Sequence, residues 1–312
     1  VDEEAMSLAA RDVLKEVVEK SPYELLDKNN YRKLYYEMSK EAQYKECLLM
    51  AEYAENTKHC MVSYYVLSPV GDAKTVGGSY QRMFPTMKLY RSYDNADVRR
   101  DCNITGAYNP NNRYGSDLSK IPSETVDGYR YYVPAESSGV ASGTSTALWC
   151  TGKFRVSDPK ERSSISANQC VMNYPLMRMA EVRLQYAEAL YFTGDESGAR
   201  KQFDPVRERV LAGDVSLKKL NEAYYRSDFV EELLEERGRE LCYESKRKID
   251  LIRFGRITET IEELPSEGGP NNVAVGIDLL KDNWRSYKIW LPVPQLEIDL
   301  NPNLEQNAVY AD

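Results

Sequence analysis

The order of apolar and polar residues predicts helices at both ends of the chain. Near the start, one apolar residue recurs every three or four positions, which is the spacing of a single helical face. This stripe predicts a helix over 4–20 and consists of Met6, Ala10, Val13 and Val17. Across the whole chain, we expect helices to fill most of 4–42, 176–211 and 222–260.

Two apolar stripes flank a turn signal at Thr193-Gly194-Asp195. Glycine ends helices readily and aspartate begins them readily, so the turn predicts two consecutive helices. The stripes are Met179, Val182, Tyr186 and Leu190, followed by Ala199, Phe203 and Val206. The pattern is that of a helical hairpin of the tetratricopeptide type, with one clear unit.

A charged segment over 228–246 is also expected to be helical, opened by Ser227-Asp228. Its acids come early and its bases late, which suits the helix dipole. Glu235 with Arg239, like Glu244 with Lys248, has the spacing of an ion pair within one helix. The charges therefore indicate a solvated or ion-paired helix. Prolines in 291–303 predict extended or turn structure there.

Residues 60–173 have a different texture, rich in Gly, Ser, Asn, Asp and Pro and without helical periodicity. We expect this region to be mainly irregular, with short strands such as Tyr129–Val133. The apolar run at 47–51 is ambiguous between helix and strand. Long loops in a compact domain are usually functional or disordered, and the many aromatics favour an ordered, functional region.

Composition excludes several functions. The formal net charge of -8 argues against nucleic acid and against an anionic membrane surface. The 312 residues contain no apolar run long enough to span a bilayer and no visible signal peptide. No phosphate-binding loop, Rossmann spacing or nucleophile elbow occurs. With 49 acidic residues, a catalytic pair of carboxylates stays open, although ion pairing on helix faces accounts for most of them.

Histidine and cysteine usage narrows the chemistry further. The one histidine, His59, argues against a His-rich metal site and against a Ser-His-Asp or Cys-His triad. We therefore expect no metal and no cofactor. The six cysteines form no C-x-x-C pair, so they are interpreted as buried thiols. One disulfide, Cys47–Cys60 or Cys150–Cys170, stays open as an alternative.

The candidate ligand-binding residues are aromatics of the loop-rich region. The chain has 24 tyrosines against 6 phenylalanines and 3 tryptophans. Aromatic faces stack on the apolar faces of sugar rings, while Asn and Arg supply hydrogen bonds to hydroxyls, which suits a neutral polyhydroxylated ligand or a peptide. For any one of them, plain packing is the alternative. The candidates are Tyr108, Asn109, Asn112, Arg113, Tyr114, Tyr129, Tyr131, Tyr132 and Trp149.

Three stretches resemble the SusD/RagB family. The first is YPLMRMAEVRLQYAEA at 174–189. The second is ERGRELCYESKRKIDLIRFG at 236–255, similar to the family pattern E-R-x-R-E-L-x-x-E-x-x-R-x-x-D-L-x-R-x-G. The third is LPVPQLEIDLNPNLEQN at 291–307, although members usually end near N-P-G-Y. Together, in this order, the stretches are a specific signature.

The resemblance implies a mainly α fold: a SusD-like superhelix of tetratricopeptide-like hairpins with long irregular loops. Residues 1–312 would form one such domain, incomplete at its N-terminus, with helical 1–59, loop-rich 60–173 for the ligand, and the signature region 174–312. The motifs are expected to hold the helices together by buried or half-buried ion pairs, while the ligand site lies in variable loops. The ion-pairing residues are Arg178, Glu181, Arg239, Glu240, Arg247 and Asp250.

The resemblance also implies a binding protein and not an enzyme. Such a protein sits on the outer leaflet of an outer membrane, facing the exterior, through an N-terminal lipid anchor not present in this chain. It binds an oligosaccharide and delivers it to a TonB-dependent transporter of SusC type. Peptide capture, as in RagB-like members, is the first alternative. A helical scaffold that binds only the transporter is the second.

Overall fold

The computed structural model describes residues 3–35, 40–53, 83, 85–108, 123–126, 129–132, 147–154, 173–213, 220, 224, 228–264 and 273–310. Helices dominate them, which confirms the mainly α fold class. The α-helices are α1 (Glu3–Lys20), α2 (Lys40–Glu46), α4 (Met87–Arg91), α5 (Arg99–Asn103), α8 (Met179–Phe192), α9 (Glu196–Glu208), α10 (Phe229–Glu240), α11 (Arg247–Arg253), α12 (Ile257–Glu262), α13 (Val273–Asn283) and α14 (Gln295–Leu300). The 3-10 turns are η1 (Tyr31–Leu34), η5 (Ser286–Ile289) and η6 (Ala308–Tyr310).

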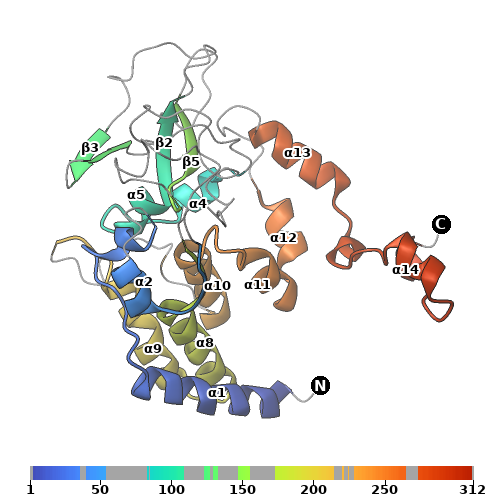
Figure 1. Ribbon diagram of the computed structural model, residues 1–312, viewed down its shortest axis with the longest axis horizontal. Coiled ribbons are helices and arrows are strands. Elements are labelled where there is room, and N and C mark those ends of the chain that lie inside the picture. Colours follow the sequence, from blue (N-terminus) through green and yellow to red (C-terminus); the bar gives the residue numbers. More distant parts are fainter. Residues whose placement is uncertain are drawn as a thin grey trace.

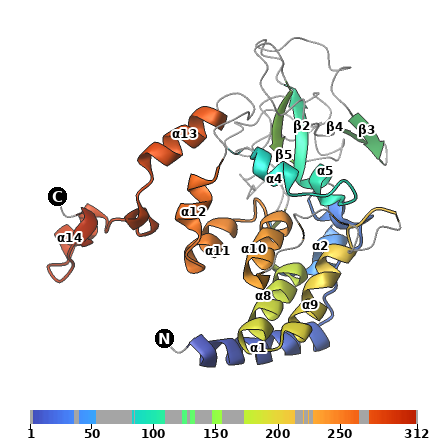
Figure 2. The same ribbon diagram turned by 180° about the vertical axis from the view of Figure 1, so that it is seen from behind.

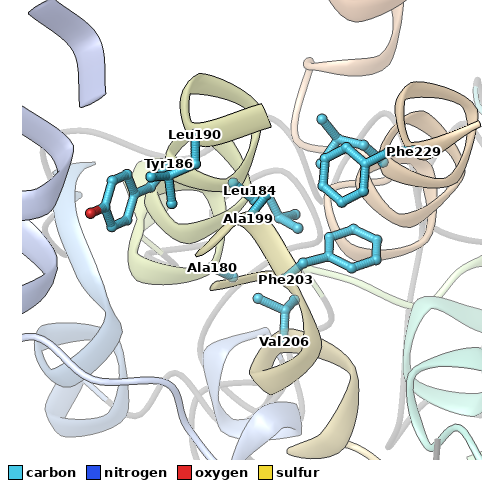
Figure 3. Packing of buried hydrophobic residues seen from close by; sticks show 10 residues of the cluster. Ala180, Leu184, Tyr186, Leu190, Ala199, Phe203, Val206 and Phe229 are labelled. Atoms are coloured by element: carbon cyan, nitrogen blue, oxygen red, sulfur yellow. The ribbon is translucent and has the colours of Figure 1, made fainter. Parts of the chain in front are cut away.

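The expected helical hairpin is present as α8 and α9. Asp195 caps α9, because its carboxylate accepts a 2.8 Å hydrogen bond from the Gly198 amide. The main core lies between this hairpin and α10 (Figure 3). Rings stack there, with the Tyr191 and Phe229 centroids 4.7 Å apart. The buried residues of the cluster are Ala180, Leu184, Tyr186, Ala187, Leu190, Ala199, Phe203, Val206, Phe229 and Leu233.

The first helix buries a different face from the predicted one. Met6 and Val13 of the predicted stripe are 60% and 64% exposed. Leu14 and Val18 pack against the core of the α8–α9 hairpin instead. Helix α1 carries apolar residues on two neighbouring faces, and periodicity alone does not say which face another helix covers.

Strand β1 (Cys47–Ala51) resolves the ambiguous run at 47–51. It pairs antiparallel with β6 (Tyr174–Arg178), with Cys47 opposite Arg178. The predicted helix start at 176 is therefore wrong: residues 176–178 belong to β6, and α8 begins three residues later, at Met179. Tyr174 precedes a proline, which disfavours the helical conformation, and the ladder to β1 supplies backbone hydrogen bonds to the extended chain.

The charged helix is shorter than predicted. Asp228 caps α10 as expected, accepting a 2.8 Å hydrogen bond from the Val230 amide. The helix then ends at Glu240 instead of continuing to 246. Tyr243 and Ser245 adopt φ values of 65° and 62°, which no α-helix allows. This turn directs the Glu244 carboxylate to Arg178 and Lys153.

The C-terminal stretch departs from the expectation of extended or turn structure. Helix α14 begins directly after Pro294. A proline at a helix start is tolerated because the amide it lacks has no partner there in any case. Figures 1 and 2 show α13 and α14 leading away from the helical body.

The remaining strands are β2 (Ile104–Tyr108), β3 (Ser123–Val126), β4 (Tyr129–Tyr132) and β5 (Ala147–Thr151). The strand expected from Tyr129 is confirmed as β4. Short helices α4 and α5 precede these strands and lie between α10 and the β2–β5 pair, which stands at the end of the molecule opposite α1 (Figure 1). Among the described helices, none is long and apolar enough to cross a membrane.

Three of the cysteines are buried free thiols: Cys47, Cys102 and Cys242. The Cys47–Cys60 disulfide is therefore not formed. Cys60, Cys170 and His59 lie outside the described residues, and Cys150 is described only by its place in β5.

Candidate ligand-binding site

Strands β2 and β5 bring two of the candidate aromatics together. We call this antiparallel pair, residues 104–108 and 147–151, the β2–β5 ribbon. Trp149 lies opposite Gly106, and Tyr108 lies opposite Ala147. Because residues two apart share a face of a strand, Tyr108 and Trp149 occupy positions on the same face of the ribbon.

The β3–β4 hairpin carries three more candidates. Tyr129 is opposite Val126, Tyr131 opposite Glu124, and Tyr132 opposite Ser123. By the same alternation, Tyr129 and Tyr131 occupy one face and Tyr132 the other. Strand β4 also lies against β2, which brings the hairpin next to the ribbon.

The other four candidates fall outside the described residues. They are Asn109, Asn112, Arg113 and Tyr114, all within 109–122, the stretch that follows β2.

Polar side chains hold the base of the ribbon against the C-terminal end of α10. Asn103 directly precedes β2, and its Nδ2 donates a 3.0 Å hydrogen bond to the Arg239 carbonyl. Lys153 follows β5 by two residues, and its Nζ donates 2.7 Å hydrogen bonds to the Glu240 carbonyl and the Glu244 carboxylate. Both side chains are buried.

A buried charge network extends from this base into the helical body. Arg178 donates to Glu244 and to Glu46 at 2.8 Å each, and it also pairs with Glu240. Glu240 in turn accepts a 2.8 Å hydrogen bond from Arg99. These charges come from β6, α2, α5 and the α10 region, so the network joins elements far apart in the sequence.

The four other predicted ion-pairing residues also have partners. Arg239 pairs with Glu236 at 2.9 Å. Arg247 pairs with Glu235 at 3.2 Å and is half-buried. The remaining pairs are Asp250 with Arg237 at 2.7 Å, and Glu181 with Lys246 at 3.1 Å.

The network keeps its carboxylates ionised. Burial alone would raise the pKa of Glu240, but Arg209, Arg178 and Arg99 hold it well below its ordinary value. Burial likewise opposes the ionised form of Glu244, yet Arg178 and Lys153 lower its pKa to about 2. In the described part of the chain, no group of three or more potential metal ligands occurs.

The family model described as "SusD family" matches residues 16–310. The chain belongs to the SusD family. Two curated members show how much of a SusD-family protein it represents. Starch-binding protein SusD of Bacteroides thetaiotaomicron is 29% identical over 201 residues, which is 63% of this chain and 31% of that protein. SusD-like protein P2 of Formosa agariphila is 28% identical over 250 residues, 76% of this chain and 42% of that protein.

Two solved structures share the fold of this chain. A SusD homolog from Bacteroides thetaiotaomicron superposes with a TM-score of 0.68 and 19% identity. Surface glycan-binding protein A from the same organism, in complex with laminarihexaose, gives a TM-score of 0.63 and 19% identity. Each likeness covers 98% of this chain and 60% of the solved chain. Of the two curated SusD-family relatives, by contrast, the chain matches less than half the length.

The sequence reasoning missed several members of the charge network. Glu236 and Glu244 stand in the SusD-family signature at 236–255, so that motif contained the signal. Arg99 and Lys153 lie in the loop-rich region, where nothing local marks a buried charge. Among the described residues, the missed members include Glu46, Asp97, Arg99, Lys153, Arg207, Arg209, Glu232, Glu236, Arg237 and Glu244.

A separate cavity of about 630 Å³ opens between α4, the α10–α11 turn and α12. Its walls include Leu89, Leu251 and Leu264, and Tyr243 is the one aromatic among its described lining residues. The aromatic strands remain the candidate ligand site of this SusD-family chain, on the composition of the loop-rich region and the register of β2 with β5.

Proposed function

We propose that this chain binds an oligosaccharide through the aromatic residues of the β2–β5 ribbon and the β3–β4 hairpin. The observation that carries the proposal is the register of the ribbon, in which Tyr108 and Trp149 share a face. Two aromatic positions on one face suit stacking against successive sugar rings. The names of two relatives, a starch-binding protein and a glycan-binding protein solved with laminarihexaose, support the same ligand class.

The role in the cell follows from family membership and is equally a proposal. The protein sits on the outer leaflet of the outer membrane, held by an N-terminal lipid anchor. It passes its ligand to a TonB-dependent transporter of SusC type. The relatives with informative names are binding proteins, which supports a function without catalysis.

Peptide capture is the second candidate function. In the described part of the chain the ribbon is a two-stranded sheet, so each strand has an outer edge. Edge strands can add an extended peptide by backbone hydrogen bonding. The third class, a scaffold that binds only the transporter, requires neither stacking nor a strand edge.

Isothermal titration of the 312-residue chain with laminarihexaose and with a maltohexaose fragment of starch tests the proposal. One stacking platform contributes about 1 kcal/mol, so Trp149→Ala is expected to weaken the Kd about fivefold. The matched control is Trp290→Ala, because Trp290 is 66% exposed on the arm leading to α14. Both variants should melt like the wild type.

The outcomes separate the three functions. Unchanged affinity in Trp149→Ala, for a glycan that the wild type binds, removes Trp149 from the site. Weaker binding in Trp290→Ala alone moves the site to the C-terminal arm. Binding of an extended peptide with no response to either glycan favours peptide capture, and no binding of either ligand favours the scaffold.

A further inference from the structure

We propose that Asn103 and Lys153 are positioning residues: they anchor the β2–β5 ribbon to the C-terminal end of α10 and so orient the ligand-binding face. The ligand part of this inference rests on the proposed function. The anchoring part stands on the contacts of the two side chains alone.

The anchor uses carbonyls that a helix leaves without partners. The last four carbonyls of an α-helix have no amide to accept from within the helix. At the end of α10, the Arg239 carbonyl accepts from Asn103 Nδ2 at 3.0 Å and from the Tyr93 hydroxyl at 2.8 Å. The Glu240 carbonyl accepts from Lys153 Nζ at 2.7 Å. Side chains flanking both strands of the ribbon therefore cap one helix.

Charge strengthens the contact of Lys153. The C-terminal end of a helix carries partial negative charge, which attracts a cation. Lys153 is completely buried, and its Nζ also pairs with Glu244 at 2.7 Å. It lies 4.7 Å from the centre of the Tyr35 ring. A buried ammonium is tolerated only when it is paired and hydrogen-bonded. Glu244 supplies the ion pair, the Glu240 carbonyl supplies a hydrogen bond, and the Tyr35 ring adds a cation–π contact.

A backbone hydrogen bond also joins the chain segments that carry the two anchoring residues. The amide of Gly152 donates a 2.7 Å hydrogen bond to the Asn103 carbonyl. This bond extends the pairing of β2 with β5 by one step at the base of the ribbon, between Asn103 and Gly152. Figure 1 shows the ribbon rising from this point, above α4, α5 and α10.

The ribbon depends on this base for its orientation. An isolated two-stranded sheet is marginally stable in water. Tyr108 lies at the end of β2 farthest from Asn103, so a small rotation at the base displaces it more than any other position of the strand. Ligand affinity should therefore depend on Asn103 and Lys153, although neither is placed in the binding face.

Hydrogen exchange on Lys153→Met tests the anchor without any ligand. The matched control is Arg207→Met. Arg207 lies on α9, is as buried as Lys153, and pairs with Glu232 and Glu236 of α10, away from the ribbon. Both variants lose a buried cation. In Lys153→Met alone, amides of 104–108 and 147–151 should exchange at least about tenfold faster, because the substitution removes two charge-assisted hydrogen bonds, to the Glu240 carbonyl and to the Glu244 carboxylate. Equal exchange in the two variants overturns the anchor.

Asn103→Ala provides a second test if Lys153→Met does not fold. It removes the hydrogen bonds of the Asn103 side chain to the Arg239 carbonyl and to the hydroxyls of Tyr93 and Tyr31, and it leaves the contacts of Lys153 in place. Faster exchange at the ribbon again supports the anchor, and unchanged exchange refutes it. Titration with laminarihexaose and maltohexaose then tests the positioning role. A loosened ribbon with wild-type affinity overturns that role. If the wild type binds neither glycan, the proposed function and the positioning role fail, while the exchange rates still decide the anchor.

Discussion

Replacing Arg178 with methionine measures how much the buried charge network stabilises the fold. Arg178 is completely buried at the end of β6. Its guanidinium donates to Glu244 and Glu46 at 2.8 Å and to the Glu240 carbonyl at 2.7 Å. Methionine keeps much of the apolar volume but donates nothing. The substitution therefore leaves buried carboxylates with less compensating charge, and we expect the free energy of unfolding to fall.

The contacts of the partners set the size of the effect. Breaking a buried ion pair by removing one partner costs about 3–5 kcal/mol. Each orphaned acid keeps another cation: Glu46 pairs with Arg209, Glu240 with Arg99, and Glu244 with Lys153. We therefore expect a loss near the lower end, about 3 kcal/mol. Domains of this kind unfold at a cost of about 5–15 kcal/mol, so the variant should remain folded.

Urea unfolding at neutral pH, followed by circular dichroism, measures the loss. The midpoint should fall while the slope with urea stays unchanged, because the surface exposed on unfolding is the same. The control is Arg11→Met. Arg11 pairs with Asp12 on α1, and both side chains reach solvent at 34% and 71%. An exposed pair of this kind contributes less than about 1 kcal/mol.

A loss in Arg178→Met as small as that of the control would refute the reasoning. A double-mutant cycle with Glu244→Gln provides the second check. Because the two side chains share a pair of hydrogen bonds, the double variant should lose less stability than the sum of the single variants. Additive losses would show that Arg178 and Glu244 do not interact in solution.

Three further outcomes are expected. Burial opposes the ionised form of Glu244, but Arg178 and Lys153 lower the pKa of Glu244 to about 2, below its value in the unfolded chain. The ionised Glu244 therefore stabilises the fold above about pH 4.5, and this stabilisation is lost as the pH falls toward 2. Thermal melting across that pH range measures the loss. Gly194→Ala should cost about 1 kcal/mol in a thermal melt, because φ is +85° there while a Cβ would meet nothing within 4 Å. Burial and the neighbouring Glu46 raise the pKa of Cys47 to about 12, so peptide mapping after iodoacetamide treatment at pH 8 should find Cys47 alkylated only in urea.

Local sequence determined the α8–α9 hairpin. Gly194 and Asp195 end one helix and begin the next through their own backbone and side-chain preferences. The stripe of Ala199, Phe203 and Val206 is buried as predicted, because helical periodicity needs no information from distant residues. The signature stretches likewise indicated the family.

Tertiary contacts decided the end of α10. Its composition favours a helix through residue 246, yet the chain turns after Glu240. The turn gives Glu244 two buried cations, Arg178 and Lys153. A continued helix would have offered it only the exposed Lys248, one helical turn away. Helix propensity amounts to less than 1 kcal/mol per residue, so buried charge pairing outweighs it.

The candidate ligand site shows the same division. Composition singled out Tyr108 and Trp149 as aromatics in a region without a helical core, and nothing local could show that they share one face. That face exists because β2 pairs with β5 in one register. Lys153 carried no local signal at all, since its partners Glu240 and Glu244 lie far away in the sequence. Periodicity and turn chemistry are properties of neighbouring residues, whereas strand register and buried charge depend on which distant segments meet.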